Sequence, residues 1–86
     1  MNADIIKVSG KAKSYPAGYL TAGIDFPVGR YKIYGGSSNF IVHDADGWLR
    51  VNIILGSKYG VSEYIYTFAE GDQVRAESAF KMVPVK

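Results

Sequence analysis

The chain has 86 residues, no cysteine and a formal net charge of +2, and 48% of its residues are hydrophobic. This length predicts a single domain over residues 1–86, and the lack of cysteine excludes disulfides and thiolate metal sites. The basic side chains are spread along the chain without forming a dense stripe, so we expect no nucleic-acid partner. No stretch has the apolar length of a membrane span or a signal peptide, so we expect no membrane contact and a cytoplasmic location as synthesised.

Short extended segments separated by glycine and proline make up the first half of the chain. The pattern predicts a strand at Asp4–Val8, a loop at Lys11–Gly18, an extended segment at Tyr19–Ala22, a turn at Asp25–Gly29 and a strand at Arg30–Tyr34. Residues 1–18 are thus expected to form an N-terminal strand and loop. In the last of these strands, the alternation of side chains places Tyr31 and Ile33 on the core side.

The second half continues in the same way. It predicts strands at Asn39–His43, Trp48–Leu55, Val61–Phe68, Gln73–Glu77 and Phe80–Val85, separated by turns. Phe40, Val42, Val74 and Ala76 fall on the inward phase of their strands. The best helix candidate, Glu63–Glu70, is rich in β-branched and aromatic residues, which favour a strand.

A lone sheet of such strands would leave one apolar face in water. We therefore predict an all-β fold, either a compact antiparallel β-sandwich or a flattened jelly-roll-like barrel of seven to eight short strands. Neighbouring short strands also favour hairpins and meanders as connections.

The segment His43-Asp44-Ala45-Asp46-Gly47 raises the question of chemistry. Its Asp-x-Asp-Gly spacing resembles the start of a calcium loop, but an EF-hand counted from Asp44 would have Trp48 and Leu55 where oxygen ligands are needed. A hairpin explains the segment better, with Asp44 bonding the turn backbone and Gly47 supplying a bulge. We expect a turn histidine, no metal site, no cofactor and no catalytic residues.

Aromatic side chains on the outward phase or in loops are the best candidates for a binding surface. Together with a nearby arginine, the candidate binding residues are Tyr19, Tyr34, Trp48, Arg50 and Tyr59. Exposed tyrosine, tryptophan and arginine are typical of contact surfaces. The alternative is that these rings only cover the edges of a small core.

The run Ile53-Ile54-Leu55 is apolar on both phases of its strand. We interpret this as a strand whose second face is covered, either by Met1–Val8 or by another subunit. A homo-oligomer with closed symmetry, paired through strand edges, is therefore one hypothesis.

The chain also resembles a small all-β module found in proteins of Gram-positive bacteria and their phages. The resemblance spans about residues 19–85 and is carried by Tyr19–Ile33, Ser38–Val42, Asp44–Gly47, Val51–Gly56, Glu70–Asp72 and Phe80–Val85. It implies an appended or stand-alone β module with no catalytic residues to transfer. It also implies a phage-encoded or mobile-element origin, with the chain in the virion or the host cytoplasm.

The first functional hypothesis is a non-enzymatic module that binds or assembles with protein, through exposed aromatics and strand edges. The alternative is a carbohydrate-binding module in which Trp48, Tyr34 and Tyr59 form a stacking platform. A small hydrolase or metal-dependent enzyme around His43 and Asp44, with Asp46, ranks third.

Overall fold

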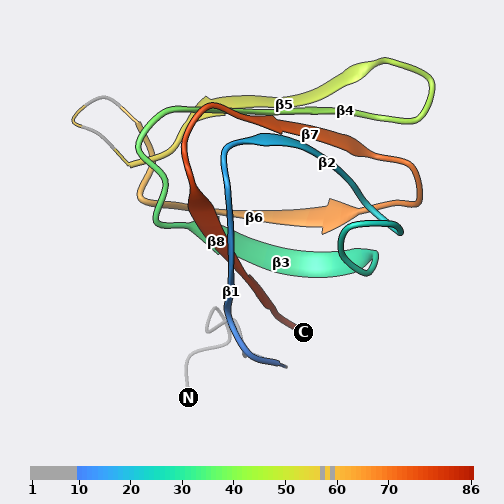
Figure 1. The fold of residues 1–86 in the computed structure, drawn as a ribbon, viewed down its shortest axis with the longest axis horizontal. Coiled ribbons are helices and arrows are strands. Elements are labelled where there is room, and N and C mark those ends of the chain that lie inside the picture. The colour runs from blue at the N-terminus through green and yellow to red at the C-terminus, as the bar shows by residue number, and fades with distance from the viewer. Residues whose placement is uncertain (1–9, 57, 59) are drawn as a thin grey trace.

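The computed structural model describes residues 10–56, 58 and 60–86, so the expected strand Asp4–Val8 and the candidate Tyr59 lie outside the described residues. Eight strands form two antiparallel sheets of four (Figure 1). In chain order they are β1 (Lys13–Tyr15), β2 (Gly18–Thr21), β3 (Gly29–Tyr34), β4 (Asn39–His43), β5 (Leu49–Ile54), β6 (Glu63–Phe68), β7 (Gln73–Ala76) and β8 (Phe80–Pro84). The all-β prediction is confirmed, and the two separate sheets make the fold a β-sandwich.

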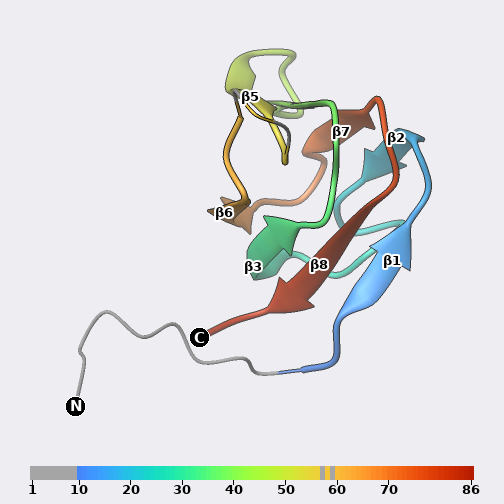
Figure 2. The ribbon, with the colours of Figure 1, turned by 90° about the vertical axis from the view of Figure 1, so that its left-hand side faces the viewer.

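The strand orders are β1-β8-β3-β6 in the first sheet and β2-β7-β4-β5 in the second. Figure 2 shows the two sheets from one end, with β5 and β6 at one open side of the sandwich and β1 and β2 at the other. Within the described residues only β4 and β5 form a hairpin of neighbouring strands, because every other connection crosses to the opposite sheet. The expectation of several hairpins and meanders was therefore wrong.

Hydrophobic alternation correctly identified the inward face of most strands. Tyr31 and Ile33 of β3 are buried, as are Phe40 and Val42 of β4, while their neighbours are more exposed. The expected loop at residues 11–18 was wrong in its centre, where Lys13–Tyr15 is a strand. Its pairing with Phe80–Met82 of β8 supplies hydrogen bonds that outweigh its weak local preference.

Aromatic rings join the two sheets. Phe40 of the second sheet meets Phe80 of the first edge-to-face, with ring centroids 5.1 Å apart, and Phe80 stacks on Tyr15 at 5.5 Å. Phe26, from the loop between β2 and β3, closes one end of this core against Phe68 at 4.9 Å. Burial raises the pKa of the Tyr15 phenol, so this one ionisable ring of the cluster stays neutral over the ordinary pH range.

One strand departs from the expectation of two-sided burial. In β5, Val51 is buried and Ile53 is half-buried, but the side chain of Ile54 on the opposite face is 41% exposed. The described residues therefore cover β5 on one face only. They also contain no helix long and apolar enough to cross a membrane.

Candidate functional site

The hairpin between β4 and β5 is built around one carboxylate. Oδ1 of Asp44 accepts hydrogen bonds from the backbone N–H groups of Asp46 and Trp48, at 3.0 and 2.9 Å. The Asp44 N–H donates to the Trp48 carbonyl at 2.8 Å, and Gly47, with φ of 89°, donates to the Asp44 carbonyl. The predicted hairpin is confirmed, with a β-bulge that leaves Arg50 as the extra residue of β5.

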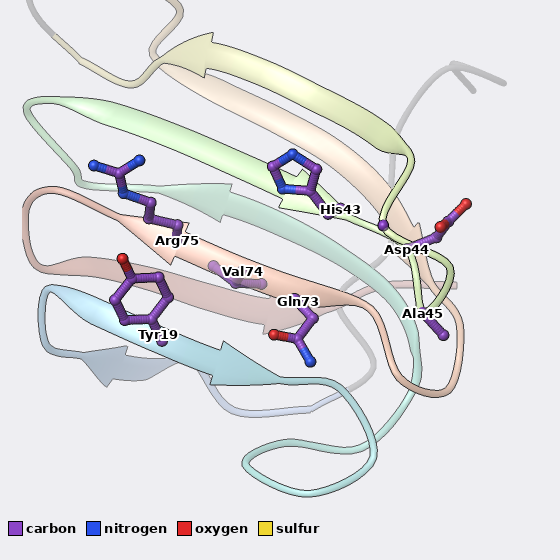
Figure 3. Close-up of a pocket in the computed structure, with 8 residues that line it drawn as sticks. Tyr19, His43, Asp44, Ala45, Gln73, Val74 and Arg75 are labelled. Atoms are coloured by element: carbon purple, nitrogen blue, oxygen red, sulfur yellow. The ribbon is translucent and has the colours of Figure 1, made fainter.

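This arrangement bears on the enzymatic alternative. In the described chain no hydrogen bond joins His43 to a carboxylate, and Figure 3 shows the Asp44 carboxylate turned away from the imidazole. No group of three or more histidine or acidic side chains is close enough to hold a metal ion among residues 10–56, 58 and 60–86. Asp44 here orders a turn, and the geometry gives no support to acid–base or metal chemistry at this segment.

The hairpin geometry predicts the effect of removing its carboxylate. Asp44→Ala is expected to lower the free energy of unfolding by about 1–2 kcal/mol, since two backbone donors lose a charged acceptor. Asp46→Ala is the matched control, because the Asp46 carboxylate accepts no hydrogen bond in the described part of the chain; a change within about 0.5 kcal/mol is expected there. Urea denaturation of both variants measures the difference. Equal losses would show that the Asp44 bonds contribute nothing.

The outer face of the second sheet carries a shallow concavity of about 400 Å³. Register explains which side chains meet there. Tyr19 of β2 is paired with Arg75 of β7, and His43 of β4 is paired with Gln73 of β7. Because side chains alternate along each strand, the burial of Val74 turns both Gln73 and Arg75 outward, beside Tyr19 and His43.

Figure 3 shows these four side chains on one face of three adjacent strands. Ala45 and Gly47 of the hairpin add backbone to the same rim. The Tyr19 side chain is 76% exposed, and the Arg75 guanidinium lies 3.3 Å from the Glu77 carboxylate through one of its nitrogens. Its remaining N–H groups can still donate, and a guanidinium accepts nothing. The concavity therefore favours a ligand group that accepts hydrogen bonds.

The structure does not bring the five candidate binding residues together. Tyr19 lines the concavity. Tyr34 ends β3 in the first sheet, with the Lys32 ammonium 5.4 Å from its ring, whereas Trp48 follows the far end of β4 in the second sheet. Trp48 and Tyr34 therefore do not form a shared stacking platform. Arg50 is exposed at the bulge in β5, next to Trp48 along the chain.

Sequence reasoning missed Gln73 and Arg75 as site residues. The alternation of β7 had correctly placed Val74 and Ala76 inward, which puts Gln73 and Arg75 on the outer face. What the sequence did not reveal is that β7 lies between β2 and β4. This order pairs residues 30 or more positions apart and carries no local signal.

Comparison with known proteins yields no relative: no family model, no curated protein and no solved structure matches the chain. The resemblance to a module of Gram-positive bacteria and their phages stays a prediction.

Proposed function

We propose that the chain is a non-enzymatic module that binds protein through the concavity on the outer face of the second sheet. The observation that carries the proposal is the exposed pair Tyr19 and Arg75 standing side by side on neighbouring strands at this concavity. Tyrosine and arginine, with tryptophan, are the residue types that most often anchor protein interfaces. The surrounding His43 and Gln73 supply polar contacts of the kind found at an interface rim.

The chemistry of the lining favours one kind of partner segment. The Arg75 guanidinium can only donate hydrogen bonds. Asp44 is the one acidic residue that lines the concavity, and its Oδ1 already accepts two backbone N–H groups. A partner segment that presents a carboxylate side chain beside an apolar group matches this arrangement. The carboxylate bonds to Arg75, and the apolar group packs on the Tyr19 ring.

Photo-crosslinking tests the proposal in the cells that encode the chain. With p-benzoylphenylalanine in place of Tyr19, we expect a discrete covalent adduct that protease treatment degrades. The same probe in place of Thr67, an exposed residue of β6 on the other sheet, is the control and should give none. Mass spectrometry of the adduct should place the crosslink in an acidic segment of the partner.

Arg75→Gln supplies the second arm of this test. Loss of a charge-assisted bond costs about 1.5–3 kcal/mol, so the affinity should fall by about tenfold or more. An adduct that resists protease would favour the carbohydrate alternative. Equal labelling from both probe positions, or an adduct unaffected by Arg75→Gln, would overturn the proposed site.

A further inference from the structure

The first sheet holds most of the basic residues that lie in strands. Its four strands contain four basic residues and one acidic residue, namely Lys13, Arg30, Lys32, Lys81 and Glu63. In the described part of the chain, the other six acidic residues all lie in loops. The expectation of no nucleic-acid partner came from the spacing of basic residues along the chain, and that spacing does not reveal this grouping.

The acidic loops gather at one end of the sandwich. A Cβ on Gly23 would meet the Glu70 carboxylate, and a Cβ on Gly71 would meet Ala45. The β2–β3, β4–β5 and β6–β7 connections therefore lie together, and they carry five of the six loop carboxylates. A polyanion is repelled from this end and attracted to the first sheet.

Three of the four basic side chains share the outer face of the first sheet. The core-facing residues of β3 alternate with Arg30, Lys32 and Tyr34, which therefore point to the outer face. The Cα atoms of its two cationic residues lie about 7 Å apart along the strand. Lys81 of β8 is paired with Tyr34 and shares this face. Arg30 and Lys81 are exposed, and the Lys32 side chain is 30% exposed.

Tyr34 stands among these cations. The Lys32 ammonium lies 5.4 Å from the centre of the Tyr34 ring, and Lys81 is opposite Tyr34 on the neighbouring strand. The Glu63 carboxylate of β6 lies 3.7 Å from the Lys32 ammonium. Both side chains of this ion pair are partly exposed, so the pair is weak and a phosphate group can replace the carboxylate.

We propose that the outer face of the first sheet binds single-stranded nucleic acid without preference for sequence. Phosphate groups contact the cations of Arg30, Lys32 and Lys81, and one base stacks on the Tyr34 ring. Cations that repeat along a strand suit a chain of regularly spaced negative charges. This face and the concavity belong to opposite sheets, so the inference does not depend on the proposed function.

Two other polyanions fit this face less well. A membrane surface needs exposed apolar anchors, but none of the exposed large hydrophobic side chains of the described chain lies on a strand of the first sheet. Val83, the apolar neighbour of Lys32 on this face, is only 5% exposed. An acidic polypeptide would pair with the cations but would leave the Tyr34 ring without a role. An aromatic ring among cations is typical of surfaces that bind single strands.

Fluorescence anisotropy of a labelled oligothymidine tests the proposal on the whole chain. A length of about 12 nucleotides falls within the site sizes of such surfaces. At about 20 mM salt we expect a dissociation constant of about 1–100 μM. With three phosphate contacts, the affinity should fall about a hundredfold between about 20 and 200 mM salt.

Single substitutions locate the site. Lys32→Gln and Lys81→Gln should each weaken binding about fivefold or more at low salt and reduce its salt dependence, since each removes one phosphate contact. Arg50→Gln is the matched control, because it removes one charge from the second sheet, and it should change neither quantity. Tyr34→Leu should weaken binding about fivefold or more, whereas Tyr34→Phe keeps the ring and should not. Circular dichroism confirms that each variant is folded.

Three results would overturn the proposal. The first is no binding at about 20 mM salt with several hundred micromolar protein, or equal losses for Arg50→Gln and Lys81→Gln. The second is an oligoglutamate of the same charge that binds as tightly, or an affinity that folded Tyr34→Leu leaves unchanged, since either would assign the face to an acidic polypeptide. The third is tighter binding to phosphatidylserine vesicles than to the oligothymidine, which would assign the face to a membrane.

Discussion

Phe80→Ala is expected to lower the free energy of unfolding by about 3–5 kcal/mol. Phe80 is 2% exposed; its ring meets Phe40 of the opposite sheet edge-to-face and stacks on Tyr15 of its own sheet. Removing it leaves a cavity between rings that cannot easily collapse onto one another. Since the free energy of unfolding of a domain is only about 5–15 kcal/mol, the variant is expected to lose a large part of its total stability.

Urea denaturation followed by circular dichroism in the aromatic region measures this loss. Tryptophan emission is a poor probe, because Trp48 is 71% exposed in the folded chain and gains little water on unfolding. Trp48→Ala is the control and should change stability by no more than about 0.5 kcal/mol, as should His43→Ala. Similar losses for Phe80→Ala and Trp48→Ala would contradict a core centred on the Phe40–Phe80 contact.

The contrast between Phe80 and Trp48 shows which side-chain positions can be predicted from the sequence. Alternation of side chains identified the inward residues of β3, β4 and β7, because a strand with one buried face must repeat every two residues. Trp48 stands in a turn, where no period applies. Among the described residues, two hydrogen bonds between its backbone and Asp44 hold it in place, and its side chain lies in solvent.

Turn chemistry was also readable from the sequence. Asp44 was expected to bond the backbone of its turn, and it accepts N–H groups from Asp46 and Trp48. Asp25 and Asp72 do the same in their turns, accepting from Thr21 and Ala69. An aspartate bonds to backbone within a few residues of itself, so the information is local. Asp72 does so while only 3% exposed.

The candidate site was not readable in the same way. The concavity depends on β2, β7 and β4 lying side by side, and the pairs Tyr19–Arg75 and His43–Gln73 join distant parts of the chain. Tyr19 could be chosen from the sequence as an aromatic residue outside the core. Nothing in the sequence distinguished Arg75 from other arginines on the outward face of a strand. The strand Lys13–Tyr15 was missed for the same reason, because only its partner β8 makes it a strand.

A close approach of two backbones leads to the second large effect. Gly56 follows β5 with φ of 66°, a left-handed conformation, and a Cβ placed on it would overlap the carbonyl oxygen of Gly36 in the β3–β4 connection. The backbone at Gly56 cannot easily retreat, since its N–H donates to Val61 at 2.7 Å and the neighbouring Leu55 N–H donates to Ser38 at 3.0 Å. These bonds hold the two connections between the sheets together.

Comparison with Gly47→Ala separates the cost of the left-handed backbone from the cost of the steric overlap. Gly47 also has a positive φ, 89°, but a Cβ there would meet nothing within 4 Å. Its alanine variant should therefore lose only the cost of the left-handed backbone, about 1–2 kcal/mol. Gly56→Ala should lose that and a further 1–3 kcal/mol or so for the overlap. Equal stability of the two variants, judged by their urea midpoints, would contradict the close approach of Gly56 to the Gly36 carbonyl. The packing of the two sheets at this end would then differ from that described.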